Sequence, residues 1–170
     1  MKKIISVLLV FVLCVGSCFA FTGCSGSSAD GKYKIGICQL MEHVALDAAT
    51  DGFKQAIIDE LGADAVEFDL QNGQNDPTTC STIVNQFVSN NVDLILANAT
   101  PALQSAAAAT GDIPILGTSV TEYGVALDIK DFTGTVGGNV SGTSDLAPLD
   151  EQAAMLIEWF PDAKNVGLLY

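Results

Sequence analysis

Apolar positions along the chain follow two alternating patterns, and the alternation predicts an α/β fold. Short runs that are almost wholly apolar are typical of strands buried on both faces of a parallel sheet. They lie at 34–39, 66–70, 93–97 and 113–116. Apolar residues spaced three and four apart predict helices, and these lie at 44–61, 76–88 and 100–109. Strands and helices in this order predict right-handed crossovers and a doubly wound parallel sheet.

The pattern changes after residue 130. Residues 132–140 are rich in Gly and Thr, and they predict a fifth strand followed by a crossover. Helical spacing returns at 149–160, and 166–170 is apolar enough for one further strand. Because that strand lacks a following helix to cover it, we expect residues 143–170 to open a second domain that continues beyond the printed chain.

The N-terminal residues carry a pattern typical of an export signal. Lys2 and Lys3 precede an apolar run at 4–15, which is too short for a comfortable membrane span. The segment 21–24 resembles a bacterial lipobox, in which the thiol of the final cysteine, here Cys24, receives a diacylglycerol. Phe21 departs from the leucine that is usual in this motif.

From this pattern we expect a signal peptide at 1–23, lipidation at Cys24, and a flexible Gly- and Ser-rich tether at 24–32. We therefore expect the protein to be exported and anchored through Cys24 to the outer face of the cytoplasmic membrane, or to be periplasmic. Two alternatives stay open, namely ordinary cleavage after Ala20 and an uncleaved anchor helix.

Charge excludes several classes of ligand. Without Lys2 and Lys3, five lysines remain against 20 acidic residues, a formal net charge of −15, and the chain contains no arginine. Binding to nucleic acid depends on neutralising phosphates, so a nucleic-acid partner is excluded. A site for phosphate or sulfate esters usually recruits arginine and is equally disfavoured.

Cysteines and histidine give no sign of metal chemistry. Cys38 lies in an apolar strand pattern and Cys80 on the apolar face of a helix, so they are either two buried free thiols or a disulfide. With one histidine and no closely spaced cysteine pair after Cys24, we expect no metal site and no cofactor.

Sequence motifs of common enzymes are also absent. The first predicted strand lacks the Gly-rich turn of a dinucleotide fold, and the glycines at 134–142 lack the Lys-Ser/Thr of a P-loop. A Gly-x-Ser-x-Gly elbow is missing, and His43 has no evident nucleophile partner. We therefore expect a binding protein and not an enzyme.

Polar side chains gather where the predicted strands end. Ligands of open parallel sheets bind at the carboxyl ends of strands, where helix N-termini attract anions. Without arginine, a ligand carboxylate would use backbone N–H groups and hydroxyls, while Asp145 would pair with an ammonium group. The candidate ligand-binding residues are Gln39, Glu42, His43, Asn98, Ala99, Thr100, Thr118, Ser119, Thr121, Ser144 and Asp145. Thr100 and Asp145 have alternative roles as local caps, and His43 as a local cap or a solvated loop residue.

Three segments, 39–47, 97–102 and 142–149, together resemble the TrpX-type family of ABC-transporter substrate-binding proteins, which is associated with aromatic amino acids. The resemblance implies a two-lobed type-1 periplasmic-binding-protein fold, with lobe 1 at 33–142. It also implies a crossover and the start of lobe 2 at 143–170. The sequence departs from the family pattern at Val44, where proline is usual, and at 121–123, where Asp-Pro is usual.

The resemblance implies capture of an aromatic or apolar amino acid and its delivery to an ABC permease. An alternative is a ligand-sensing lipoprotein of the same fold that signals to a membrane partner. A weaker alternative is a lipid-anchored α/β enzyme.

Overall fold

The structure is a computed structural model that describes residues 31–167. The expected signal peptide, Cys24, most of the tether and the last three residues of the expected terminal strand lie outside the described residues.

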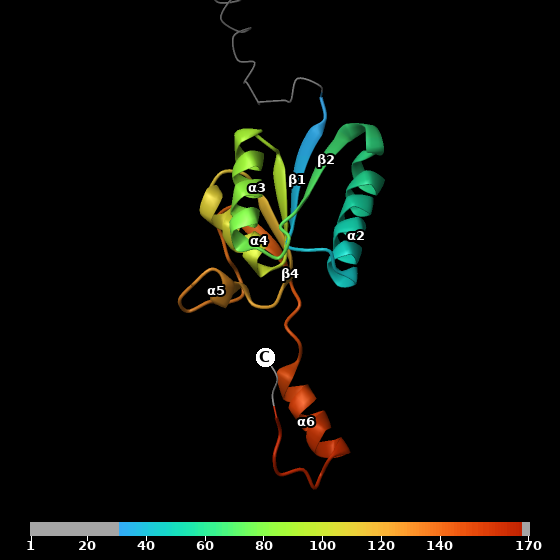
Figure 1. Cartoon of the computed structure of the whole chain (residues 1–170), viewed down its shortest axis with the longest axis vertical. Coiled ribbons are helices and arrows are strands. Elements are labelled where there is room, and N and C mark those ends of the chain that lie inside the picture. Colours follow the sequence, from blue (N-terminus) through green and yellow to red (C-terminus); the bar gives the residue numbers. More distant parts are fainter. Residues whose placement is uncertain (1–30, 168–170) are drawn as a thin grey trace, which may run out of the picture. The chain divides into compact units, whose positions relative to one another are not determined.

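A five-stranded parallel sheet forms the centre of the fold (Figure 1). Its strands are β1 (Tyr33–Gln39), β2 (Val66–Asn72), β3 (Leu94–Asn98), β4 (Ile115–Val120) and β5 (Val140–Ser144). The order across the sheet is β2-β1-β3-β4-β5, and every neighbouring pair is parallel. The α/β class and the doubly wound parallel sheet expected from the sequence are therefore confirmed.

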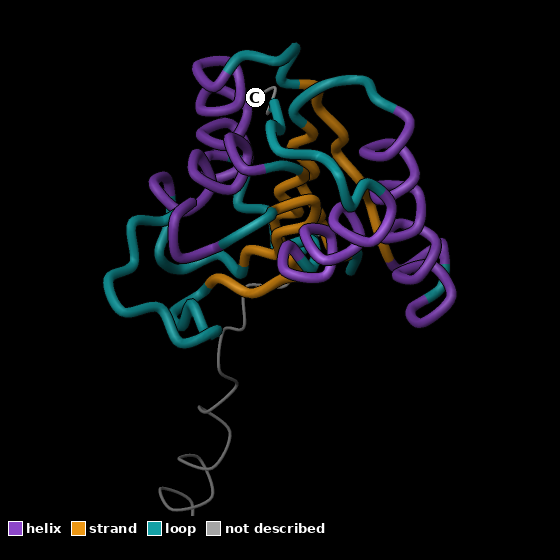
Figure 2. Tube along the Cα trace, turned by 90° about the horizontal axis from the view of Figure 1, so that it is seen from below, coloured by secondary structure: helices purple, strands orange, loops and turns teal. Residues whose placement is uncertain are grey.

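Helices cover both faces of the sheet, as the view along the strands in Figure 2 shows. On one face lies α2, and on the other lie α3 and α4. The helices are α2 (Val44–Leu61), η2 (Ala63–Ala65), α3 (Pro77–Ser89), α4 (Thr100–Ala109), α5 (Tyr123–Ala126) and α6 (Leu149–Trp159). The part of the chain that the structure describes contains no helix long and apolar enough to cross a membrane.

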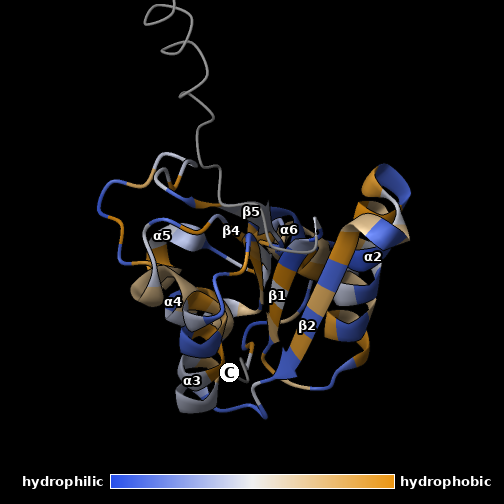
Figure 3. Cartoon of the chain, turned by 90° about the horizontal axis from the view of Figure 1, so that it is seen from above, coloured by the Kyte–Doolittle hydropathy of each residue, from blue (hydrophilic) through white to orange (hydrophobic). Residues whose placement is uncertain are grey.

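Alternation along β1 sends side chains into two separate cores. Ile35 and Ile37 pack with residues of α2, whereas Cys38 joins the larger core under α3 and α4. Gly36 also faces α3, because a Cβ added there would lie 2.6 Å from the ring of Phe87. Polar residues interrupt the edge strand β2, which Figure 3 shows as alternating colours.

The region after β4 differs from the prediction. Most of the stretch 132–140 is a loop, and β5 begins only at Val140. The loop turns at Gly134, Gly137 and Gly138, whose positive φ angles suit glycine and interrupt an extended strand. The short helix α5 was not predicted at all.

Helix α6 begins at Leu149 as predicted, but none of its residues is buried. Trp159 is 66% exposed, and Ile157 is 70% exposed. Residues 166–167 form no strand.

Candidate functional site

The carboxyl ends of the strands bring the predicted polar residues to one edge of the sheet. Gln39 of β1 pairs in register with Asn98 of β3, and Asn98 pairs with Thr118 of β4. The end of β5 places Ser144 opposite Val120. Segments that are up to a hundred residues apart in sequence thus meet at this edge, as the sequence predicted.

Three buried side chains form a hydrogen-bonded relay behind the edge. The Thr50 hydroxyl, from the middle of α2, donates to Gln39 Oε1 at 2.6 Å and accepts from Asn98 Nδ2 at 2.9 Å. Asn98 Nδ2 also donates to the carbonyl of Leu46 at 2.8 Å, and Gln39 Nε2 donates to Asp47 at 2.7 Å. The relay fixes the first turns of α2 against the ends of β1 and β3.

This relay changes the interpretation of two candidate residues. The Gln39 amide is bonded to protein atoms on both sides, so it braces the edge, and a ligand would have to displace one of these bonds. Asn98 keeps one free acceptor. Within residues 31–167, its Oδ1 is the one buried side-chain oxygen or nitrogen that has no hydrogen-bond partner. Thr50 was missed, although it shares a helical face with Phe53 and Ile57, where a polar residue is unexpected.

The backbone is strained directly after β3. Ala99 has φ 93° and ψ 157°, a region that residues other than glycine rarely enter. Ser119, one residue after the partner of Asn98 on β4, also has a positive φ of 54°. Strain of this kind is common at ligand clamps and costs on the order of 1–3 kcal/mol per residue.

Helix α4 begins without a side-chain cap. Ala99, and not Thr100, occupies the N-cap position, so the alternative role of Thr100 as a cap is wrong. The N–H groups of Thr100 and Ala102 have no acceptor in the described part of the chain. Pro101 contributes no N–H group. Ala102 is buried, so the unpaired N–H group of Thr100 and the positive end of the helix dipole are what α4 presents at the sheet edge.

Other helix starts near the edge are capped. His43 accepts at Nδ1 from Ala45 N at 3.2 Å and so caps α2, which is one of its expected alternative roles. Asp76 caps α3, and Glu122 caps α5 by accepting from two N–H groups. The hydrogen bonds to Asp76 hold the pKa of its carboxyl below the ordinary range. The open start of α4 thus differs from the capped starts of α2, α3 and α5.

Hydroxyl groups surround the start of α4. The side chains of Thr100, Thr118 and Ser119 are partly exposed and make no hydrogen bond among the described residues. Ser144 instead donates to the Thr121 carbonyl at 2.6 Å and so joins the exits of β5 and β4. These polar groups can accept from or donate to a small ligand.

A cavity of about 410 Å³ opens at the β1 and β2 side of the edge. It is lined by Gln39, Glu42, Asp47, Thr50, Asp51, Leu70 and Asn72. Its wall contains three carboxylates and no basic side chain. The cavity therefore suits a cationic group and repels an anionic one.

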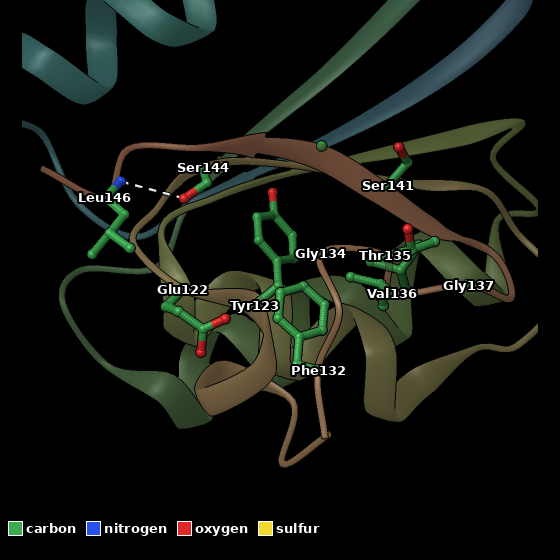
Figure 4. Close-up of a pocket in the computed structure, with 12 residues that line it drawn as sticks. Glu122, Tyr123, Phe132, Gly134, Thr135, Val136, Gly137, Ser141, Ser144 and Leu146 are labelled. Carbon is green, nitrogen blue, oxygen red and sulfur yellow. Dashed lines mark hydrogen bonds between the residues drawn. The ribbon is translucent and has the colours of Figure 1, made fainter. Parts of the chain in front are cut away.

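A second cavity of about 650 Å³ lies between α5, β5 and the loop at 132–137 (Figure 4). Figure 4 shows Tyr123 pointing from α5 toward β5 with Phe132 beside it. The Tyr123 hydroxyl donates to the Thr143 carbonyl at 3.2 Å. Burial, followed by the charge of Asp145, raises the pKa of Tyr123. A Cβ at Gly117 would overlap this hydroxyl, so the tyrosine joins β4, α5 and β5.

Cys38 and Cys80 are both buried and free. Residues 31–167 contain no cluster of three or more His, Cys, Asp or Glu side chains that could hold a metal ion.

Comparison with known proteins identifies similar sequences. A family model described as ABC transporter substrate binding protein matches residues 34–170. A curated tyrosine-binding protein of Clostridioides difficile (strain R20291) is 41% identical over 183 residues, which cover 99% of this chain and 52% of that protein. The chain spans about half the length of the curated relative it matches.

Two solved structures are also similar to this chain. A ligand-free, open substrate binding protein with adhesive properties from Clostridium difficile is 42% identical, with a TM-score of 0.68 over 78% of this chain and 45% of that one. An ABC domain in complex with L-Trp from Streptococcus pneumonia is 34% identical, with a TM-score of 0.68 over 74% of this chain and 43% of that one.

Proposed function

The chain belongs to the family of ABC transporter substrate binding proteins, and from this premise we propose that it forms one lobe of a clamp for an aromatic or other apolar amino acid. The two relatives named for tyrosine and L-Trp support this class of ligand. In this proposal residues 33–142 are lobe 1, and 143–170 cross into lobe 2. The chain acts by binding and not by catalysis.

The open start of α4 is the observation that carries the proposal. The unpaired N–H group of the partly exposed Thr100 and the positive end of the helix dipole suit a ligand carboxylate. The hydroxyls of Thr100 and Ser119 add donors beside them. Because the chain contains no arginine, this backbone site is its most suitable group for an amino acid's carboxylate.

Carboxylates on either side of this start suit the ligand's ammonium group. Glu42 lines the acidic cavity, and Asp145 is exposed at the exit of β5. The buried acceptor Asn98 Oδ1 lies between these flanks, directly before Ala99. Ala99, His43, Thr118, Thr121 and Ser144 complete the proposed rim of the site.

The binding proposal is tested by NMR titration of the ¹⁵N-labelled chain, which detects weak binding by a single lobe. L-tyrosine and L-tryptophan should shift the amide signals of Thr100, Ala102 and Ser119. L-tyrosinamide, which lacks the carboxylate, should leave these signals in place. Equal responses to tyrosine and its amide would contradict the carboxylate site, and no response to any amino acid would contradict the amino-acid class.

A variant separates the site from nonspecific effects. Thr100→Val keeps the shape of the side chain and removes its hydroxyl, so the response to tyrosine should weaken several-fold. Thr82→Val makes the same change on the exposed surface of α3 and should leave the response unaltered.

We further propose that the protein is exported, anchored through lipidated Cys24, and delivers its ligand to an ABC permease. The apolar run and lipobox-like segment before Cys24 support the anchor. Metabolic labelling with a radioactive fatty acid should mark the wild-type protein and not Cys24→Ala. If the wild type and Cys24→Ala are both labelled, the acyl group is attached to a residue other than Cys24.

A further inference from the structure

Two thiols lie buried where β1 meets α3. Cys38 and Cys80 are both 0% exposed and belong to one apolar cluster. Neither takes part in the proposed ligand site. The chain therefore carries a buried pair of oxidisable groups whose role is unassigned.

The geometry of the two elements places these residues against each other. Phe87 of α3 lies over Gly36 of β1, which fixes one contact between strand and helix. Two residues along β1, ~7 Å, lead to Cys38 on the same face. Seven residues back along α3, ~10 Å, lead to Cys80 on the same helical face. Because α3 covers β1 in the opposite direction, both steps lead toward the carboxyl edge of the sheet.

Contacts at that point agree with this register. Cys38 and Cys80 lie in one buried cluster, where burial and then the charge of the neighbouring Cys80 raise the pKa of Cys38. A Cβ at Gly73 would overlap the Cys80 sulfur, and Gly73 N donates to the Gln39 carbonyl at 2.7 Å. The Cys80 sulfur thus lies within the backbone turn that follows β1 and β2.

We propose that Cys38 and Cys80 are the site of a disulfide that links β1 to α3 in the exported protein. One S–S bond forms and two S–H bonds break. The two electrons and two protons pass to a disulfide exchange partner, of the class of glutathione disulfide, which is released as two thiols. The presence of this oxidant depends on the proposed export, whereas the pairing itself depends only on the fold.

The burial of the thiols determines when the bond can form. Burial, and then the neighbouring Cys80, raise the pKa of Cys38, so the reactive thiolate is scarce in the folded chain. Exchange therefore takes place during folding, before α3 closes over β1. Once buried, the bond is protected from reducing agents for the same reason.

The link would join the ligand edge of the sheet to the start of α3. Cys38 is followed by Gln39 of the buried relay, and the Leu40 carbonyl accepts from Asn75 just before α3. A bond between 38 and 80 closes a loop that includes α2, β2 and the start of α3. It removes conformations from the unfolded chain without a new contact in the folded one.

The test refolds the full chain in a glutathione redox buffer, unfolds it in denaturant at low pH, blocks the free thiols there with N-ethylmaleimide, and maps the digested peptides by mass spectrometry. A linked peptide pair containing Cys38 and Cys80 is expected. Reduction before refolding should lower the thermal midpoint by on the order of 10 °C. Cys80→Ala should abolish this difference, whereas Cys24→Ala should retain it.

Labelling of both Cys38 and Cys80 by the blocking reagent would overturn the proposal, as would pairing of either with Cys24. If Cys80→Ala does not fold, Cys38→Ala provides the same comparison. Because no ligand enters the test, failure of the disulfide leaves the proposed function intact, and failure of ligand binding leaves the disulfide intact.

Discussion

Replacing Thr50 by valine would remove the hydroxyl that connects Gln39 and Asn98 while keeping the volume of the side chain. Thr50 is 2% exposed, so water cannot replace the lost group. Gln39 Oε1 would lose its donor, and Asn98 Nδ2 would keep only the Leu46 carbonyl.

Leaving two buried polar groups short of a partner costs about 1–3 kcal/mol each. The additional apolar carbon of valine returns ~1 kcal/mol. The net expectation is a loss of about 1–5 kcal/mol in the free energy of unfolding, measured by urea denaturation with circular dichroism.

Thr50→Ser is the matched control, because it keeps the hydroxyl and loses one methyl group, at a cost of ~1 kcal/mol. Thr82→Val on the exposed face of α3 should change stability by less than ~0.5 kcal/mol. If Thr50→Val proves as stable as the wild type, or more stable than Thr50→Ser, the relay does not brace the edge and the reasoning is refuted.

Three further changes address other features. Ala99→Gly should raise the unfolding free energy by ~1 kcal/mol, because glycine adopts φ 93° without strain, and a loss in the same denaturation assay would contradict strain at this position. Gly36→Ala should lower the unfolding free energy by about 1–3 kcal/mol, because the added Cβ would overlap the Phe87 ring. Gly111→Ala is the control, since a Cβ at that position has no other atom within 4 Å. The pKa of Asp76 is lowered by its bonds to Thr79 and Thr78, so its stabilisation is complete above its ordinary value near 3.8 and is lost as pH falls below it. Asp76→Asn should reduce the loss of thermal stability at low pH, as measured by thermal melts. If the loss is unchanged, other carboxyls cause it.

Much of the architecture could be predicted because burial leaves a periodic pattern in the sequence. β3 is buried along most of its length, and its first four residues are all apolar. At the start of α3, Asp76 caps the helix and Pro77 lies in its first turn, which is the residue chemistry typical of a helix start. Where a segment is covered on both faces or capped by its own side chains, local sequence is sufficient.

The region between β4 and β5 lacks such a pattern. α5 has only four residues, too few to show helical spacing, and it depends on the carboxylate of Glu122 for its start. The glycines at 134, 137 and 138 look compatible with an extended strand, but their positive φ angles make turns. Glycine permits both conformations, so the sequence does not distinguish them.

The candidate site was predictable in position but not in internal bonding. Parallel strands must end at one edge, so Gln39, Asn98 and Thr118 could be placed together from strand order alone. The partner of Gln39 is Thr50, whose contribution depends on how far α2 lies above the sheet, and spacing along the chain does not encode that distance. The strain at Ala99 is likewise invisible in the sequence, since alanine gives no sign of an unusual φ.

The contact between Tyr123 and the two glycines opposite it has a consequence for sequence variation among relatives. The phenol occupies the space that a Cβ at Gly117 or Gly142 would need. An exchange of Gly117 alone should therefore be rejected, whereas a smaller residue at 123 should permit alanine at 117. Gly142 should stay glycine in either case, because a Cβ there would also overlap the carbonyl oxygen of Gly117. Positions 117 and 123 are thus expected to change together along a lineage, as one inherited pair that joins β4 to α5, while 142 stays fixed.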